Sequence, residues 1–441
     1  INDVGHLDNF AEYTLKCIEH LSDYMLDITP ENTLVLCSTK VLEMYKDLGF
    51  NILPCELENH DNWKYKTMLP WELVEKIASN KKNENHDIIN KKVHKSCLKM
   101  YSLYNLSNRI QTLFNDDMIG DDGDITETRD YNTYVRQMDD IAGLKYHDTK
   151  DYIKPGRIGD IGCAVGSWIK LACSNEKLRE SDFYGVEVAR KLFDLCIQRK
   201  NNNEFPNPFV FFSRKNAVTG LCFENNSMDT IHTSSLTHEI ESYGGREDLI
   251  NFIINRHKEL VVGGVWINRD VVGPENNGET VYLKLSKEDG CDENIYFETD
   301  DNDKLNKVLS KLNTFSRFMR FAGDFRSSYG YKVEYEFVEI DGIDYIKTSL
   351  FNAHEFITKK DYTDNWKSEM HESFCFFSFK DWENIMNKHG FKISSSSKQY
   401  VNPWIVENRF KNKVWIYKEI NGKLELQDYP VTNMLLICEK I

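Results

Sequence analysis

The stretch "GRIGDIGCAVGSW", residues 156–168, decides the fold of this chain. It combines an apolar run with a turn in which Gly162 and Gly166 follow the carboxylate of Asp160. A strand that runs into a glycine turn and then a helix is where an open α/β sheet holds a nucleotide-type cofactor. The stretch lacks the first glycine pair of G-x-G-x-x-G, so it does not favour a dinucleotide-binding dehydrogenase. It therefore predicts a cofactor site at the end of this strand.

Alternating strand and helix patterns after the turn predict a parallel sheet with helices on both faces. Further strands are expected in "FYGVEV", "PFVFFSR", "MDTIHTSS", "GGVWINRDVV" and "NMLLICEKI", and helices in "EDLINFIINRHKEL" and "FKDWENIMNKHGFKI". Residues 275–375 interrupt the alternation with two strand-like runs joined by Asp341-Gly342, a dipeptide typical of tight hairpins. We expect this insertion to form a lid or a substrate wall, because ligands of open α/β sheets bind beyond the carboxyl ends of the strands.

Polar side chains end the second and third strands of this predicted sheet. Glu187 ends the second strand, where a carboxylate can accept hydrogen bonds from both hydroxyls of a ribose. Asn216 follows the third strand, where its amide can read an adenine edge. Because these strand ends meet at one edge of the sheet, they favour a single cofactor site over a chance glycine turn.

These motifs resemble those of the class I S-adenosylmethionine-dependent methyltransferases. "DIGCAVGSW" looks like their motif I, D-x-G-C-x-x-G, and "GVEVA" is similar to their acidic second motif. "GGVWINRDVV", the helix that ends in "HGF" and the closing strand also match, so the resemblance covers roughly residues 131–441 apart from the insertion. It implies an α/β fold with a Rossmann-like, doubly wound, mostly parallel sheet, and S-adenosyl-L-methionine as cofactor.

The resemblance also implies roles for individual residues. Asp160, Gly162 and Gly166 would face the methionine part of the cofactor, Glu187 the ribose and Asn216 the adenine.

Two further cofactor residues are expected, Arg136 and Ser234. Ser234 ends the fourth strand. Arg136 lies in "YNTYVRQMDD", on a helix that often closes over the cofactor in this family; the alternative for this residue is a solvated helix face.

Methyl transfer from a sulfonium needs in-line positioning and desolvation, and a base only when the acceptor is a hydroxyl or a protonated amine. "SSLTHEIESYGG", residues 234–245, follows the fourth strand, whose end points toward the methyl group in this fold. His238 and Glu239 are the candidate bases, with Tyr243 as an orienting residue. The structural alternative is that His238 caps a helix and Glu239 is solvated.

Candidate substrate-binding residues lie further along the chain. Arg269 ends the fifth strand and either binds substrate or forms a structural ion pair with Asp270. Two segments dense in hydrogen-bonding groups, "KKDYTDNWKSEMHE" and "NPWIVENRF", contribute Tyr362, Asn365, Trp366, Glu369, Trp404 and Arg409. No metal site is expected, since His371 and Glu372 lack further ligands at metal-site spacing and "NDDMIGDDGD" lacks the closing glutamate of a calcium loop.

Three functions remain open from the sequence. The first is an enzyme that methylates an oxygen or nitrogen of a small metabolite or nucleotide-type acceptor. The second is an RNA methyltransferase module of a larger RNA-processing protein, favoured by the arginines and phenylalanines of "FSRFMRFAGDFR". The third is a catalytically silent binding subunit that keeps the fold. The net charge of −15 favours the first over the second, because nucleic-acid binding usually needs a basic face.

The length of 441 residues predicts more than one domain. We expect an N-terminal α/β fragment with a helical region over residues 1–130, and the methyltransferase domain over residues 131–441. "NTLVLCSTKVLEMYKDLGFNILPCEL" predicts a strand, a helix and a second strand, either the tail of a larger α/β domain or a small helical cap. The chain begins at Ile1, so we expect a piece of a longer protein whose other domains are its partners.

The composition indicates an intracellular protein. The eleven cysteines include no C-x-x-C pair, which favours reduced thiols and a cytoplasmic location. No run of 18 apolar residues is present, so no membrane partner is expected.

Overall fold

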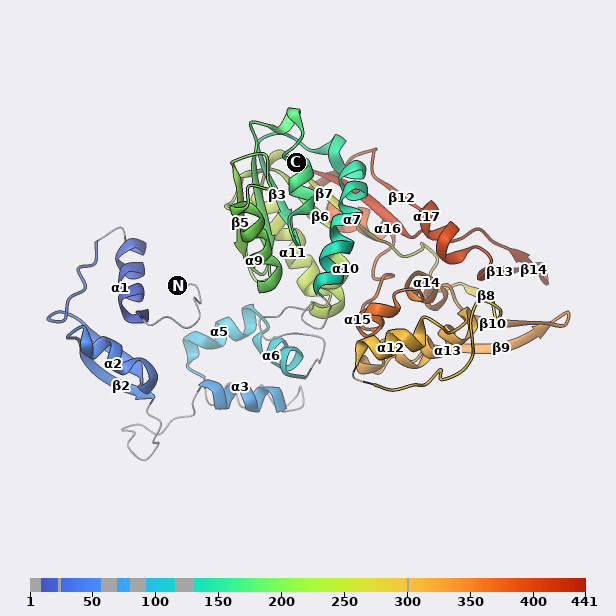
Figure 1. Ribbon diagram of the computed structural model, residues 1–441, viewed down its shortest axis with the longest axis horizontal. Helices are drawn as coiled ribbons and strands as arrows, with labels where there is room; N and C mark the ends of the chain where they lie inside the picture. Colours follow the sequence, from blue (N-terminus) through green and yellow to red (C-terminus); the bar gives the residue numbers. More distant parts are fainter. Residues whose placement is uncertain (1–8, 23–24, 57–69, 80–92, 116–130, 300) are drawn as a thin grey trace. The chain divides into compact units, whose positions relative to one another are not determined.

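The computed structural model describes residues 9–22, 25–56, 70–79, 93–115, 131–299 and 301–441 (Figure 1). The chain divides into two compact units, residues 1–115 and 116–441. The sequence places the domain border at residue 130, and the residues between the two borders lie outside the described ones. "NDDMIGDDGD" is also outside them apart from its first residue.

The first unit contains the predicted strand–helix–strand segment. Strand β1 (Leu34–Ser38) pairs in parallel with β2 (Asn51–Glu56), and α2 (Thr39–Asp47) connects them. Gly49 has a φ of 85°, the left-handed conformation that ends a helix, two residues after α2. The other helices among its described residues are α1 (Phe10–Leu21), α3 (Pro70–Ser79), α5 (Lys95–Leu103) and α6 (Leu106–Asn115).

The second unit is built on a mostly parallel sheet with the strand order β11-β15-β7-β6-β3-β4-β5, with β12 paired to β15. The parallel strands are β3 (Arg157–Ile161), β4 (Asp182–Glu187), β5 (Val210–Arg214), β6 (Met228–Ser234) and β7 (Leu260–Val271). The closing strand β15 (Asn433–Lys440) runs antiparallel to β7, β11 (Phe391–Ile393) and β12 (Lys398–Tyr400). This doubly wound Rossmann-like α/β sheet confirms the predicted fold class.

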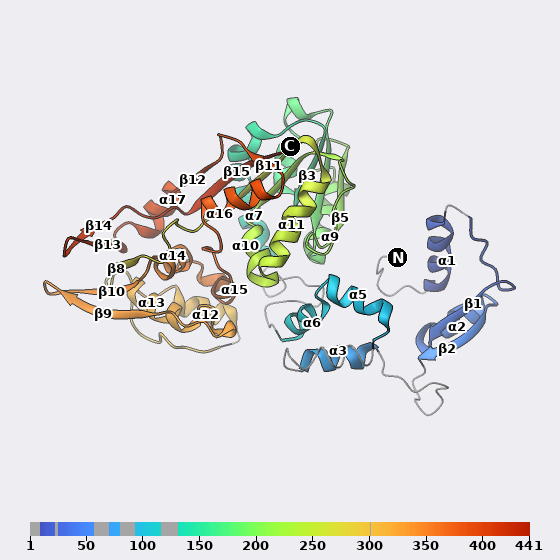
Figure 2. The same ribbon diagram turned by 180° about the vertical axis from the view of Figure 1, so that it is seen from behind.

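Helices cover both faces of this sheet, as Figures 1 and 2 show from opposite sides. On one face lie α7 (Tyr131–Thr149), α8 (Ser167–Ala172) and α9 (Arg190–Asn201), and α8 and α9 pack on apolar residues of β3 to β5. On the other lie α11 (Arg246–Glu259) and α16 (Phe379–Lys388), packed on β6, β7 and β15. The first parallel strand, β3, lies in the middle of the parallel strands, and the glycine turn follows directly after its last residue, Ile161.

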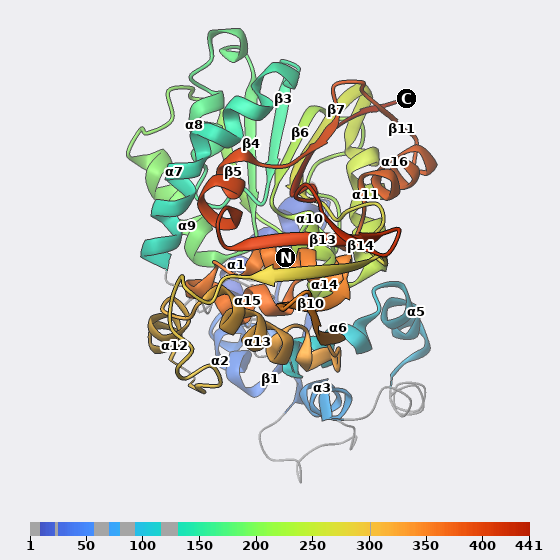
Figure 3. The same cartoon turned by 90° about the vertical axis from the view of Figure 1, so that its right-hand side faces the viewer.

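The insertion forms a second, antiparallel sheet with the order β14-β13-β8-β10-β9. Its strands are β8 (Thr280–Leu285), β9 (Tyr335–Ile340), β10 (Ile343–Ser349), β13 (Val414–Ile420) and β14 (Lys423–Leu426), with β8 beside β13 in Figure 3. Asp341 and Gly342 both have positive φ, 53° and 75°, as a tight hairpin turn requires. The predicted insertion ends at residue 375, whereas β13 and β14 come from a later segment.

Helices of the insertion pack on one another and on this sheet. They are α12 (Asn302–Leu309), α13 (Thr314–Asp324), α14 (Leu350–Lys359) and α15 (Trp366–His371); α17 (Pro403–Ile405) follows later in the chain. Phe318 and Phe321 of α13 are fully buried in this core. Arg317 pairs with Asp361 at 2.7 Å, and Arg320 pairs with Asp324 at 2.5 Å. The Arg/Phe segment that favoured RNA is therefore largely engaged in structural contacts.

Two further findings concern the described residues alone. None of their helices combines the length and the apolar character that crossing a bilayer requires. The nine cysteines whose side chains the structure describes are all free thiols.

Candidate cofactor and active site

The glycine turn after β3 has the backbone conformation that its sequence predicts. Gly162 and Gly166 have φ of 72° and 75°, in the left-handed region where a side chain is strained. The N–H groups of Gly162 and Cys163 both donate to the carbonyl of Val186, at 2.9 and 3.1 Å. The turn is thus tied to the end of β4, and the strand ends that carry Asp160 and Glu187 lie side by side.

Glu187 lies buried between the glycine turn and the start of the next helix. One carboxylate oxygen accepts a hydrogen bond from the N–H of Ala164 at 2.9 Å. The other accepts from the N–H groups of Val188 and Ala189, at 2.9 and 3.0 Å. The carboxylate is therefore held in a fixed orientation beside the turn.

Asp160 is buried and hydrogen-bonds the neighbouring strand. Its Oδ1 lies 2.7 Å from Nδ1 of His232 on β6. The His232 ring stacks on Trp168, with ring centroids 4.0 Å apart and an interplanar angle of 4°. Nε2 of His232 is buried without a hydrogen-bond partner among the described residues.

Lys145 of α7 is a candidate site residue that the sequence did not reveal. The residue as a whole is half-buried, and its ammonium group lies close enough to Asp160, Asp270 and Glu239 to interact with their charges. Burial, and then the Arg269 guanidinium, lower the pKa of Lys145 to about 8, against the opposing effect of the carboxylates. Helical spacing could have identified it, because Lys145 continues a stripe of inward residues that includes Met138 and Ala142.

Ser234 ends β6 as expected, and its environment is compatible with a ligand. Its hydroxyl oxygen is buried without a hydrogen-bond partner among the described residues. The next residue, Ser235, has a φ of 55°, an uncommon conformation for a non-glycine residue. Buried polar atoms are nearly always hydrogen-bonded, so the orphaned hydroxyl fits a partner supplied by a bound molecule.

His238 lies between two carboxylates. Its Nδ1 is 2.7 Å from Oδ1 of Asp270, and its Nε2 is 3.4 Å from Oε2 of Glu372. Burial disfavours the imidazolium, but the two carboxylates outweigh it and raise the pKa of His238 well above its ordinary value. A protonated ring that donates from both nitrogens has no lone pair for proton abstraction, so the geometry does not favour His238 as a base.

Glu239 and Tyr243 follow in the same segment. Glu239 is half-buried and faces the charge of Lys145. Tyr243 lies in the π-helical turn Ile240–Gly244, and π-helical turns are frequent at functional sites. The Tyr243 hydroxyl donates to Oε1 of Glu372 at 3.3 Å, and its ring stacks on His371 at 4.7 Å.

Four of the six substrate residues predicted on the later segments lie close together: Tyr362, Glu369, Trp404 and Arg409. The Arg409 guanidinium lies over the rings of Tyr362 and Trp404, 4.3 and 5.5 Å from their centroids. Burial opposes the charge of Arg409, but Tyr362, Asp361 and Glu369 raise its pKa above the ordinary value. Trp404 is 58% exposed, so this stack reaches the surface.

The remaining predicted residues lie elsewhere. Trp366 is in the core of the insertion, where its Nε1 donates to Asp324 at 2.7 Å, and Asn365 precedes it, half-buried. Arg269 is buried and pairs with Asp148 of α7 at 2.9 Å, and not with Asp270. Arg136 is on the exposed side of α7, and Asn216 is exposed, with its side chain accepting from the N–H of Val218. The described part of the chain contains no group of His, Cys, Asp and Glu that could hold a metal ion.

Comparisons with known proteins find similarity only between structures. No protein-family model matches the chain, and no curated protein sequence does. Geranyl diphosphate C-methyltransferase from Streptomyces coelicolor is 9% identical over 70% of this chain and 83% of its own, with a TM-score of 0.36. The YcgJ protein from Bacillus subtilis is 12% identical over 68% of this chain and 97% of its own, with a TM-score of 0.33. A candidate S-adenosylmethionine-dependent methyltransferase from Listeria monocytogenes is 11% identical over 68% of this chain and 99% of its own, with a TM-score of 0.33. At these identities the likeness concerns the fold alone.

Proposed function

We propose that this chain transfers a methyl group from S-adenosyl-L-methionine to an oxygen or nitrogen nucleophile of a small metabolite or nucleotide-type acceptor. The observation that carries the proposal is the arrangement of Asp160 and Glu187 around the glycine turn at the carboxyl ends of β3 and β4. The orphaned hydroxyl of Ser234 supports a ligand at the end of β6.

Each end of the cofactor has a suitable group in this chain. Glu187, whose carboxylate is fixed beside the turn by backbone N–H groups, would accept from the ribose hydroxyls, and Lys145 would provide a cation for the methionine carboxylate. When bound, the cofactor supplies an activated methyl group on a sulfonium centre. Asp160 and Glu239 place negative charge near that end, which attracts a cationic centre.

The acceptor is expected between the carboxyl end of β6 and the insertion. With His238 held as an imidazolium, Glu239 is the better candidate base of the two, and His238 and Tyr243 position the segment that carries it. Arg409, stacked on Tyr362 and Trp404, would hold an anionic or aromatic part of the acceptor. The arginines and phenylalanines of α13 are the main sequence feature that favours RNA as the acceptor. Because these side chains make structural contacts, they give RNA little support.

Calorimetry with S-adenosyl-L-methionine tests the proposal. Wild type should bind with micromolar affinity, and Glu187→Ala should weaken binding at least about tenfold, because the ribose hydroxyls lose their acceptor. Glu187→Gln keeps the side-chain volume and separates loss of charge from loss of packing.

Glu180→Ala is the matched control, since Glu180 precedes the same strand and its side chain is 87% exposed. The control should bind as wild type does. No binding by folded wild type would overturn the proposal and favour the catalytically silent subunit.

A further inference from the structure

In the part of the chain that the structure describes, a loop rather than a helix follows β5 on the face of β3, β4 and β5 opposite α8 and α9. Between β5 and β6 the chain forms only a loop, residues 215–227. Parallel sheets in α/β proteins are normally covered on both faces. Here Tyr184 and Phe211 lie on the face opposite α8 and α9, and Phe211 is 43% exposed. Exposed aromatic surface on a parallel sheet indicates a binding site.

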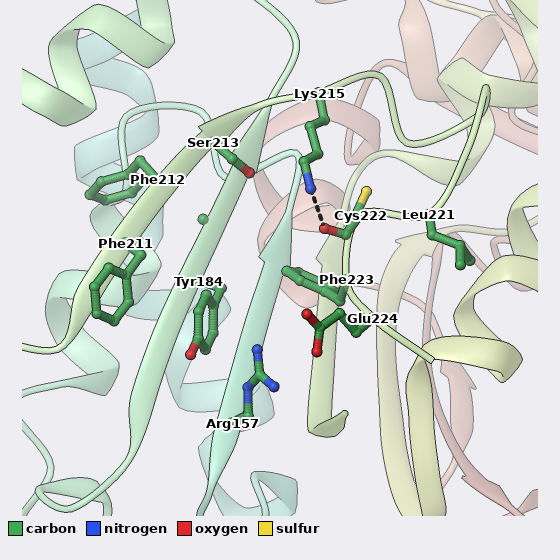
Figure 4. A pocket seen from close by; sticks show the side chains of 11 residues that line it. Arg157, Tyr184, Phe211, Phe212, Ser213, Lys215, Leu221, Cys222, Phe223 and Glu224 are labelled. Atoms are coloured by element: carbon green, nitrogen blue, oxygen red, sulfur yellow. Dashed lines mark hydrogen bonds between the residues drawn. The ribbon is translucent and has the colours of Figure 1, made fainter. Parts of the chain in front are cut away.

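The loop and this face enclose a pocket of about 380 Å³ (Figure 4). A volume of this size falls within the range of small-molecule sites, about 300–1,000 Å³. None of its lining residues belongs to the predicted cofactor set. Arg157 begins β3, whereas Asp160 and the glycine turn are at the other end of the strand. The pocket is therefore distinct from the cofactor site.

Aromatic rings form the wall of the pocket. Tyr184 and Phe211 stack with centroids 5.4 Å apart and an interplanar angle of 24°. Phe223 meets Tyr184 edge-on, with centroids 6.1 Å apart at 68°. Phe223 can approach β3 because Gly159 has no side chain, since a Cβ there would lie 2.6 Å from the Phe223 ring. Such a wall suits a planar ring that stacks.

Polar groups surround the aromatic wall. The Arg157 guanidinium lies 4.9 Å from the centroid of Tyr184, and its Nε is buried without a hydrogen-bond partner among the described residues. Glu224 and Ser213 also line the pocket, as does Lys215, whose ammonium group donates to the carbonyl of Cys222 at 2.8 Å. Figure 4 shows Arg157 and Glu224 near Tyr184 and Phe223. The pocket therefore offers hydrogen-bond donors and acceptors beside a stacking surface.

We propose that this pocket binds a nucleobase, with the ring packed against Tyr184, Phe211 and Phe223 and its polar edge toward Arg157 and Glu224. A nucleobase carries both donors and acceptors on a planar ring, which matches this lining better than a purely apolar ligand does. The base belongs either to a free nucleotide or to single-stranded RNA. The inference does not depend on the proposed methyl transfer.

Calorimetry on the full chain tests the pocket, with 5′-mononucleotides of each base and a short single-stranded RNA as probes. S-adenosyl-L-homocysteine is present at saturation, so that a nucleotide cannot occupy the cofactor site unnoticed. At least one probe should bind. Phe211→Ala and Arg157→Gln should each weaken binding about tenfold, since an aromatic contact and the guanidinium are lost.

Phe209→Ala is the matched control, because Phe209 is 53% exposed beside the same strand but does not line the pocket. It should change affinity less than about twofold. Thermal unfolding confirms that each variant folds, and Arg157→Lys replaces Arg157→Gln if the latter does not.

The two sources of the base give different results. Binding of a mononucleotide with weak salt dependence identifies a free nucleotide, whereas tighter binding of RNA that falls steeply with salt identifies a nucleic acid. The proposal is overturned if neither probe binds, or if binding is unchanged in the pocket variants. The titrations are repeated without S-adenosyl-L-homocysteine, and binding seen only in its absence also overturns the proposal, because the probe then occupies the cofactor site.

Discussion

The inward position of Lys145 results from helix geometry rather than from a sequence motif. Helix α7 places Met138 and Ala142 against the unit's core, and Lys145 follows at the same helical spacing. With its pKa lowered to about 8, Lys145 is mostly protonated at neutral pH. Arg136, the cation predicted from the sequence, lies on the exposed side of the same helix.

Substitution of these two residues separates their roles. Lys145→Met should weaken S-adenosyl-L-methionine binding by about tenfold, because the methionine carboxylate loses its counter-ion. Arg136→Met, the control on the same helix, should leave the affinity within about twofold. Wild-type affinity should fall as pH rises through about 8, where the free Lys145 loses its proton, and Lys145→Met should not show this dependence. Calorimetry between pH 7 and 9 measures the affinities of the two variants and the pH dependence of binding. A larger loss of affinity in Arg136→Met than in Lys145→Met would show that Arg136 binds the methionine carboxylate.

The sequence predicts those site residues that follow a strand directly. Asp160, Gly162 and Glu187 are local to strand ends, and the register of β3 and β4 brings them together. It does not predict Glu372 as the partner of His238, because 134 residues separate them and only the packing of α15 on the segment after β6 joins them. Arg269 and Asp270 also could not be assigned, since each pairs with a residue on another element.

At the scale of elements, several hydrogen bonds join the segment after β6 to the insertion. His238 pairs with Glu372, the Ser242 hydroxyl accepts from the N–H of Ser373 at 2.8 Å, and Tyr329 donates to the Ser242 carbonyl at 3.1 Å. The imidazolium of His238 is the only charged donor among these bonds. The attachment of the insertion should therefore depend on pH.

The sign of that dependence follows from the direction of the pKa shifts. The pKa of His238 is raised on folding, so its contribution is fully present below its unfolded pKa of about 6.5 and is lost as pH rises through the folded value. The pKa of Asp270 is lowered by His238, Thr237 and the N–H of Val271 despite burial, so its contribution is lost as pH falls through the folded value.

Glu372→Gln tests this attachment. Its side chain is 2% exposed, and removal of one partner of a buried ion pair costs about 3 kcal/mol. The variant should unfold at lower temperature than wild type at pH 6.5, and the difference should shrink as pH rises above neutrality. Thermal unfolding from pH 5.5 to 9 measures it. Glu298→Gln, at a side chain that is 82% exposed on the insertion, should match wild type throughout. A difference for Glu372→Gln that is constant with pH would contradict the ion pair.

Gly159 tests the packing of the loop on β3. Gly159→Ala should destabilise the unit by about 1–3 kcal/mol, because the new Cβ would lie 2.6 Å from the Phe223 ring. Gly220→Ala in the same loop is the control, since nothing lies within 4 Å of a Cβ there, and it should change stability by less than about 0.5 kcal/mol. Chemical denaturation gives both values. Equal stability of the two variants would show that Phe223 moves aside at little cost.

Elements with strong local patterns were predictable, and long-range pairing was not. The parallel strands, the hairpin at Asp341-Gly342 and the closing strand follow from periodicity and turn residues. β13 pairs with β8 across about three-tenths of the chain, so no local signal shows that both belong to one sheet. The missing helix between β5 and β6 is likewise visible only once the faces of the sheet are known.

At the scale of the whole molecule, each of the two units has hydrophobic core residues of its own. Tyr45 and Phe50 are buried in the first unit, and Ile231, Phe252 and Leu436 are among those buried in the second. The whole predicted cofactor set lies in the second unit. Cofactor binding should therefore not require the first.

A truncated chain of residues 116–441 should bind S-adenosyl-L-methionine within about twofold of the full chain's affinity, because every proposed contact is retained. A second truncation, residues 131–441, begins at the border predicted from the sequence and tests whether the intervening residues matter. Calorimetry gives the affinities, and thermal unfolding shows whether each fragment folds cooperatively. If the folded 116–441 fragment binds S-adenosyl-L-methionine more than tenfold more weakly than the full chain, residues 1–115 contribute to cofactor binding. The prediction that the second unit suffices for binding would then be wrong. If only the 131–441 fragment loses affinity, the domain that binds the cofactor begins after residue 115 rather than after residue 130.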